Sequence, residues 1–316
     1  MNAKIHWLLQ SLRLEAMFRF ALPLAARLPL PAGERLARAL GRFCLRHDLD
    51  WRTVALRQQY VLDRSTQAFE NMVPGIAPDA LRRLQNERFE AASREEWEGH
   101  LFPRGRATEM HCEFNGLEAV QAQLASGRGL VLLTAHFDAT LMGVVQLGLA
   151  GLKLNLMTSD VVEDPRVAPV VQRYFKNKYA GIEQYLNGGR VMHVETQLRA
   201  FYSAARRGEG VVILGDAPTL ALDDALPIDF FGHRRAFSPG AIRIAEKTGV
   251  PVAAFICRQV AHGRYRIDFG PVLPPSEGSH TDNLPALFGF IEARMRETPG
   301  RWWAADQLPV FVKLDA

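Results

Sequence analysis

The sequence predicts an α/β protein with a largely parallel central sheet, flanked by helices and preceded by a helical N-terminal region. Two observations lead to this prediction. From residue 129 onward, short apolar runs alternate with helical patterns, and such runs are typical of parallel strands buried on both faces. Before residue 107, Arg and Glu recur among Leu and Ala with no period-2 run, which indicates helices.

We predict that residues 1–106 form the helical region and residues 107–316 the α/β domain, with Pro74 and Pro78 marking breaks between helices. The apolar and basic residues at the N-terminus fit two alternatives. One is a helix packed on the rest of the protein, and the other is a segment lying on a membrane surface. No apolar run is long enough to predict a membrane-spanning helix, and the N-terminus lacks the pattern of a signal peptide.

Six apolar runs are predicted strands, and most are separated by helical stretches. In open α/β sheets, ligands bind beyond the carboxyl ends of the strands, so the residues that follow these runs are candidates for the site. The predicted strands are residues 129–135, 154–158, 190–194, 210–215, 251–257 and 265–270.

Residues 217–240 form a long non-periodic stretch, which we expect to be a functional loop. A helix-like segment follows it directly. The pattern LPALFGFIEARMRE near the C-terminus predicts one amphipathic helix, and an aromatic tail comes after it.

Composition narrows the functional classes. With 48% hydrophobic and 23% charged residues among 316, the chain is too apolar to be disordered. A net charge of +4 fits an acidic partner such as anionic lipid or an acidic carrier protein, and does not require nucleic acid. Three cysteines far apart argue against a disulfide framework or a zinc site. Nucleotide-binding glycine motifs, HExxH and GxSxG are missing, which argues against a dinucleotide-binding, P-loop, zincin or α/β-hydrolase protein, and we expect no cofactor.

His136 is the candidate catalytic residue because it follows the predicted strand GLVLLTA directly. A neutral imidazole can take a proton from an alcohol when a carboxylate fixes its tautomer. Asp138, two residues on, and Asp216, at the end of another strand, are both candidate partners. Alternatively, Asp138 caps a helix, Asp216 belongs to a turn, and His136 is a buried structural residue.

Four segments resemble the late lipid A acyltransferases and their relatives in the lysophospholipid acyltransferase group. They are GRGLVLLTAHFDATLMG, RRGEGVVILGDAP, PIDFFG with the helix after it, and TPGRWW. The resemblance implies transfer of an acyl chain from a thioester of acyl carrier protein or coenzyme A to a hydroxyl of a lipid or glycolipid. It also implies a location at the cytoplasmic face of the inner membrane, without a metal or an acyl-enzyme.

The resemblance places His136 on the family's histidine, Asp216 on its second acidic position, and Phe231 and Gly232 in its FFG loop. The chain departs from the family five residues after His136, where Leu141 replaces a carboxylate. Either Asp138 or Asp216 takes over the role of that carboxylate, or catalysis is lost. A catalytically inactive relative that binds lipid or acyl carrier protein, and a thioesterase on the same scaffold, are therefore alternative functions.

If acyl transfer holds, two further expectations follow. Backbone N–H groups at the start of the helix after His136 are expected to support the developing oxyanion. Arg234, Arg235 and Arg258 are expected to hold the phosphates of a phosphopantetheine carrier or a lipid head group, the alternative being a solvated surface. The two tryptophans of TPGRWW fit either a membrane interface or a packed core.

Overall fold

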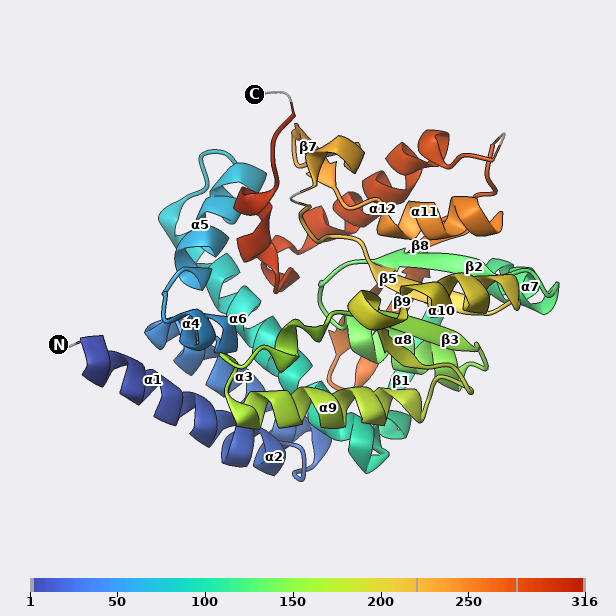
Figure 1. Cartoon of the computed structure of the whole chain (residues 1–316). Coiled ribbons are helices and arrows are strands. Elements are labelled where there is room, and N and C mark those ends of the chain that lie inside the picture. Colours follow the sequence, from blue (N-terminus) through green and yellow to red (C-terminus); the bar gives the residue numbers. More distant parts are fainter. Residues whose placement is uncertain (1–2, 220, 277, 315–316) are drawn as a thin grey trace.

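The computed structural model describes residues 3–219, 221–276 and 278–314, and its centre is a seven-stranded sheet (Figure 1). The strand order is β1-β9-β8-β2-β5-β3-β4. Every neighbouring pair is parallel except β8 and β9. The strands are β1 (His111–Asn115), β2 (Leu130–Thr134), β3 (Leu154–Thr158), β4 (Val191–His193), β5 (Gly210–Leu214), β8 (Val252–Ala261) and β9 (Arg264–Phe269).

All six predicted strands are present, and the α/β fold class is confirmed. Strand β1 was not predicted, because HCEFN mixes polar and apolar residues and gives no apolar run. This strand extends the sheet at one edge, beside β9.

Alternate residues of the central strands face two separate hydrophobic clusters, as the period of a β-strand requires. Leu132 and Val212 belong to the cluster that contains residues of α7, α8 and α9. Val131 and Val211 belong to the cluster that contains residues of α10, α11 and α12. The helices are α7 (Leu117–Ala125), α8 (Thr140–Leu149), α9 (Pro169–Glu183), α10 (Val194–Arg206), α11 (Gly240–Thr248) and α12 (Leu284–Glu297).

The N-terminal part of the chain is helical, as predicted, and packs against the sheet domain (Figure 1). Its longest helix, α6 (Pro78–Leu101), starts with a proline, whose fixed φ suits the first helical turn. A capping box between Asp50 and Thr53 starts α4. The other elements are α1 (Ala3–Ala16), the π-helix η1 (Met17–Ala21), α2 (Leu22–Ala25), α3 (Leu30–His47), α4 (Trp51–Leu56) and α5 (Val61–Met72).

A β-hairpin occupies much of the segment expected to be a long loop. Strands β6 (Leu226–Phe230) and β7 (His233–Phe237) pair in antiparallel fashion. Phe231 and Gly232 join them, and both have positive φ, 47° and 77°. A two-residue turn with both φ positive matches the right-handed twist of the strands. The hairpin was not predicted because prolines, acidic residues and arginines interrupt its apolar pattern.

Candidate active site

The strand register brings His136 and Asp216 together. Strands β2 and β5 are parallel neighbours, with Thr134 opposite Leu214. His136 and Asp216 each lie two residues beyond this pair, so they meet at the carboxyl edge of the sheet. The Nδ1 atom of His136 lies 2.7 Å from Oδ1 of Asp216, and the backbone N–H of His136 donates to the same carboxylate at 2.9 Å.

Asp216 is buried, and a tryptophan completes its surroundings. The indole Nε1 of Trp302 donates to Oδ2 of Asp216 at 2.7 Å. The ring of Phe231 stacks on Trp302 with an interplanar angle of 16°. The FFG loop therefore supports the tryptophan that holds the aspartate. Trp302 is fully buried, so the core alternative for this residue is confirmed.

His136 lies at the edge of a cavity of about 660 Å³, a volume within the usual range of about 300 to 1,000 Å³ for small-molecule sites. Its side chain is 26% exposed, and its ring meets the edge of Trp303 at a centroid distance of 4.9 Å. Leu141 lines the same cavity. Where the family has a carboxylate, this chain thus presents an apolar surface.

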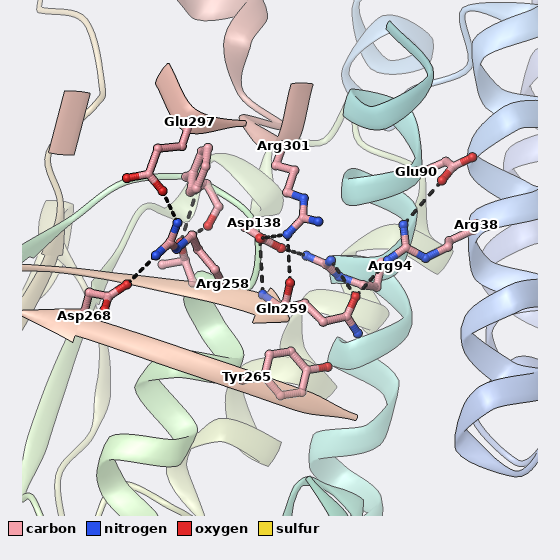
Figure 2. Close-up of polar contacts among 12 residues, drawn as sticks. Arg38, Glu90, Arg94, Asp138, Arg258, Gln259, Tyr265, Asp268, Glu297 and Arg301 are labelled. Carbon is pink, nitrogen blue, oxygen red and sulfur yellow. Dashed lines mark hydrogen bonds and ion pairs between the residues drawn. The ribbon is translucent and has the colours of Figure 1, made fainter. Parts of the chain in front are cut away.

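Asp138 lies in a different environment, a buried polar network that Figure 2 shows. Arg94 donates to one of its oxygens, and Nη1 of Arg301 donates to the other at 2.8 Å. The backbone N–H of Gln259 adds a bond at 3.2 Å. Asp138 has φ of 50°, in the left-handed region that Asp tolerates better than most residues. Its carboxylate therefore anchors the loop that follows His136.

Asp138 does not cap the following helix. That helix, α8, begins at Thr140, and Ala139 occupies its N-cap position. The hydroxyl of Thr140 accepts from the amide of Phe137 at 3.3 Å.

The backbone amides between His136 and the helix already have partners within the protein. The amide of Phe137 donates to the carbonyl of Ala135, at 2.7 Å. The amides of Asp138 and Ala139 donate to the carbonyls of Arg301 and Cys257, at 2.9 and 3.3 Å. These three amides are therefore engaged within the protein, and the expectation that amides at the start of α8 itself support an oxyanion stays a prediction.

None of the predicted substrate-binding residues lines the cavity; Phe231, Gly232, Arg234 and Arg235 lie in the β6–β7 hairpin, and Arg258 lies on β8. Gly232 is exposed in the hairpin turn, and Arg234 is exposed on β7. Arg235 is buried and donates to the carbonyls of Phe230 and Leu308.

Arg258 is also held by internal contacts. It forms ion pairs with Asp268, at 2.7 Å, and with Glu297 (Figure 2). Arg235 and Arg258 thus stabilise neighbouring segments in this structure.

Arg94 and Arg301, which hold Asp138, were not predicted as site residues. Arg94 lies on α6, 44 positions before Asp138, and is only 1% exposed. No local pattern marks such a residue. Arg301 lies in the TPGRWW segment, so the family resemblance was the available signal. Among the described residues, no group of three or more His, Cys, Asp or Glu side chains is placed to hold a metal ion.

The fold and the site define an α/β protein with a histidine–aspartate pair at the strand ends of its sheet, facing a cavity. The sequence model of the bacterial lipid A biosynthesis acyltransferases matches residues 102–305. The chain belongs to this family, as the resemblance implied. It is 25% identical over 166 residues to a lipid A biosynthesis acyltransferase of Haemophilus influenzae, an alignment that covers 52% of this chain. The chain spans about half the length of that curated relative, 49%.

Proposed function

We propose that the protein transfers a fatty acyl chain from a thioester of acyl carrier protein or coenzyme A to a hydroxyl of a lipid or glycolipid. The observation that carries the proposal is the contact between His136 and Asp216 at the edge of the cavity. Membership of the acyltransferase family supports it.

His136 acts as the general base in this proposal. An ionised carboxylate only accepts hydrogen bonds, so Asp216 fixes the proton on Nδ1 and leaves Nε2 free to accept one. As the acceptor hydroxyl gives its proton to Nε2, its oxygen forms a bond with the thioester carbonyl carbon. The carbon–sulfur bond then breaks, and the leaving thiolate takes the proton from the imidazolium.

The imidazole of His136 has a carboxylate partner even though Leu141 stands at the position of the family's carboxylate. Asp216 already contacts Nδ1 at 2.7 Å. The other ring nitrogen, Nε2, must stay free to act as the base. A second carboxylate at position 141 is therefore not needed to orient the ring. This geometry favours an active enzyme over the inactive relative. Asp138 contributes by positioning the loop and does not contact the substrate.

The predicted substrate-binding residues have separate roles in this proposal. Phe231 supports Asp216 through Trp302, and Gly232 forms the turn that carries Phe231. Of the three arginines, only Arg234 is exposed, so it is the one proposed to contact the phosphates of the donor or the acceptor.

We also propose that the N-terminal helices bind the surface of the inner membrane, on its cytoplasmic face, where the acceptor lies. Leu14, Met17 and Phe18 are buried against the protein. The other side of the same segment exposes an apolar stripe at helical spacing, formed by Ile5, Leu8, Leu9, Leu12, Phe20 and Leu24. None of the helices in the described residues is long and apolar enough to cross a bilayer.

Acyl transfer can be tested with labelled acyl carrier protein, labelled acyl-coenzyme A and bacterial lipid vesicles. Labelled lipid supports the proposal, whereas release of free acid alone identifies a thioesterase and binding without turnover identifies an inactive relative. His136→Ala should lower transfer by about 10²- to 10⁴-fold. His111→Ala is the matched control because His111 is exposed on β1. Equal transfer by His136→Ala and His111→Ala would overturn the general-base role.

A further inference from the structure

Two exposed leucines lie at the rim of the cavity beside His136. Leu56 is 45% exposed and Leu198 is 44% exposed, yet both line the cavity. Among the described residues, no other large apolar side chain is both exposed and part of the lining. Leu56 is the last residue of α4, and Leu198 lies on α10, well apart from α4 in Figure 1. Each leucine therefore marks a place where the apolar lining reaches the surface.

The rim at Leu56 adjoins the helix that carries the exposed apolar stripe. Helix α1 packs against α4, and the backbone carbonyl of His47 ties the two parts together. This carbonyl accepts from Nε2 of Gln10, on α1, at 2.7 Å and from Nε2 of Gln59, in the segment after α4, at 3.3 Å. Packing and hydrogen bonds thus fix Leu56 relative to α1, so a membrane that α1 contacts lies close to this rim.

Three arginines near this rim have no acidic partner. Arg57 follows Leu56 directly and is exposed. Arg13 and Arg46 lie beside His47, and their positive charges, after partial burial of the ring, lower the pKa of His47. None of the three arginines forms an ion pair with a described residue. Basic residues near a membrane surface are attracted to anionic head groups, so this side of the cavity suits an anionic bilayer.

The rim at Leu198 belongs to a different face of the sheet. Helix α10 packs on the face whose hydrophobic cluster includes Phe201. Leu14 and Met17, which lie beneath the exposed stripe, belong to the cluster on the other face. A bilayer that contacts α1 is therefore not expected to reach Leu198.

We propose that the cavity opens onto the membrane surface through the rim at Leu56, and that a lipid acceptor enters there from the bilayer that α1 contacts. The inference rests on the proposed function, because it takes from it a lipid acceptor and membrane binding by the N-terminal helices. It adds the entrance. The apolar chains of the acceptor pass over Leu56 without crossing water, which avoids the free-energy cost of exposing them. The rim at Leu198 stays in water.

The entrance can be tested by fluorescence quenching on the full-length protein. The background is Cys112→Ser, because Cys112 is partly exposed whereas the other two cysteines are buried and should not react. Leu8→Cys, Leu56→Cys and Leu198→Cys are made singly in this background and labelled with nitrobenzoxadiazole. The labelled proteins bind vesicles of phosphatidylethanolamine and phosphatidylglycerol, with or without a nitroxide-labelled phospholipid that quenches the label on contact.

We expect the label at position 56 to be quenched at least about half as strongly as the label at position 8, since interfacial segments insert about 5 to 10 Å into a bilayer. Leu198→Cys is the matched control, because Leu198 has the same exposure as Leu56 and also lines the cavity. Its label should not be quenched. Quenching at position 8 without quenching at position 56, or stronger quenching at position 198 than at position 56, would overturn the inference.

The same proteins separate this inference from the proposed function. No quenching at position 8 would show that α1 does not insert, and the membrane proposal and the entrance would both fall. The bulky label at position 56 should slow transfer to vesicle lipid more than the label at position 198 does, and equal rates would contradict passage at Leu56. If no protein transfers an acyl chain while position 56 alone of the two rims is quenched, the entrance stands and the transfer function falls.

Discussion

At the scale of single residues, Asp216 links three parts of the site. Its carboxylate accepts from the ring and the amide of His136 and from the indole of Trp302. The contact to the amide fixes the backbone at the strand end, and the contact to the ring fixes the imidazole. Trp302 holds the second oxygen, so the carboxylate has little freedom to rotate away from His136. Its burial strengthens these hydrogen bonds, because the local dielectric is low.

Asp216→Asn should keep the fold and lower the turnover number by about 10³- to 10⁴-fold. An asparagine amide can donate to Nδ1 and so favour the tautomer with the proton on Nε2, which cannot act as a base. Steady-state kinetics of acyl transfer measure the effect. Trp302→Phe keeps an aromatic ring but loses the indole donor and part of a buried ring; because it leaves the His136–Asp216 contact itself in place, it should lower the turnover number less. Equal losses in the two variants would contradict the tautomer argument.

Asp138→Asn tests the positioning role of the second aspartate. Removing its charge leaves Arg94 and Arg301 without their shared carboxylate in a buried site, a change that typically costs about 3 to 5 kcal/mol of unfolding free energy. Urea denaturation measures this loss. Asparagine tolerates positive φ, so the backbone conformation itself should survive.

Transfer activity at low temperature, where Asp138→Asn remains folded, gives the complementary result. If Asp138 only positions the loop, the variant should transfer acyl chains more slowly, and its rate should depend on pH as the wild-type rate does. A changed pH profile would instead support Asp138 as the partner of His136.

At the scale of elements, α6 serves two purposes with two sets of side chains. Arg88 and Glu96 face the cavity, whereas Arg94 and Glu98 enter the polar network behind the His136 loop. Arg94 and Glu98 are four residues apart, the spacing at which helical side chains meet. The hydroxyl of Tyr265 also donates to Glu98, at 2.9 Å. A displacement of α6 would therefore alter both the lining of the cavity and the loop that follows His136.

The charge of Glu98 should make stability depend on pH. Burial raises its pKa to about 7, from an ordinary value of 4.5. Between pH 4.5 and 7 the folded state keeps a proton that the unfolded state has lost, so stability falls as pH rises through this window. The loss amounts to about 3 to 4 kcal/mol, at roughly 1.4 kcal/mol per pKa unit.

Glu98→Gln removes this titration. The unfolding free energy of the variant relative to wild type should therefore increase between pH 5 and pH 8. Urea denaturation at several pH values measures the difference. The difference between the two proteins isolates the contribution of Glu98 to the pH dependence of stability, since all other groups titrate in both. Parallel pH dependences would show that Glu98 stays ionised in the folded state throughout.

The strands that carry the site were predictable because burial on both faces makes them continuous apolar runs. Their ends located His136 and Asp216, but not the contact between them. That contact depends on β2 and β5 being neighbours in the register that sets Thr134 opposite Leu214. Sequence reasoning left Asp138 and Asp216 as equal alternatives because spacing alone does not give strand order. The anchors of Asp138 come from distant elements, which only the folded chain brings together.

At the scale of the whole molecule, the N-terminal helices and the sheet share one hydrophobic cluster. Leu14 of α1 and Phe89 of α6 belong to the same cluster as Leu132 of β2 and Val171 of α9. The cavity also takes residues from both parts of the chain. The boundary predicted at residue 106 therefore separates two patterns of secondary structure that together enclose the site. Anchoring the helices to a membrane would then place the cavity close to lipid.

The exposed stripe on α1 should be required for membrane binding. The double variant Leu8→Asp/Leu12→Asp changes two side chains that are 60% and 57% exposed, so the fold should be unaffected. Each leucine is worth about 1.5 to 3 kcal/mol when fully buried in an apolar phase, so even partial insertion predicts at least a tenfold loss of partitioning. Flotation with vesicles of phosphatidylethanolamine and phosphatidylglycerol measures it.

Val260→Asp is the control for this variant, because Val260 is 47% exposed near the end of β8 and is not part of the stripe on α1. It should float like the wild type. Raising the salt concentration should weaken binding of all the proteins, since each basic residue near an anionic surface contributes about 1 kcal/mol that salt screens. Unchanged flotation of the double variant would mean that α1 does not insert, and the acceptor would have to reach the cavity by another face.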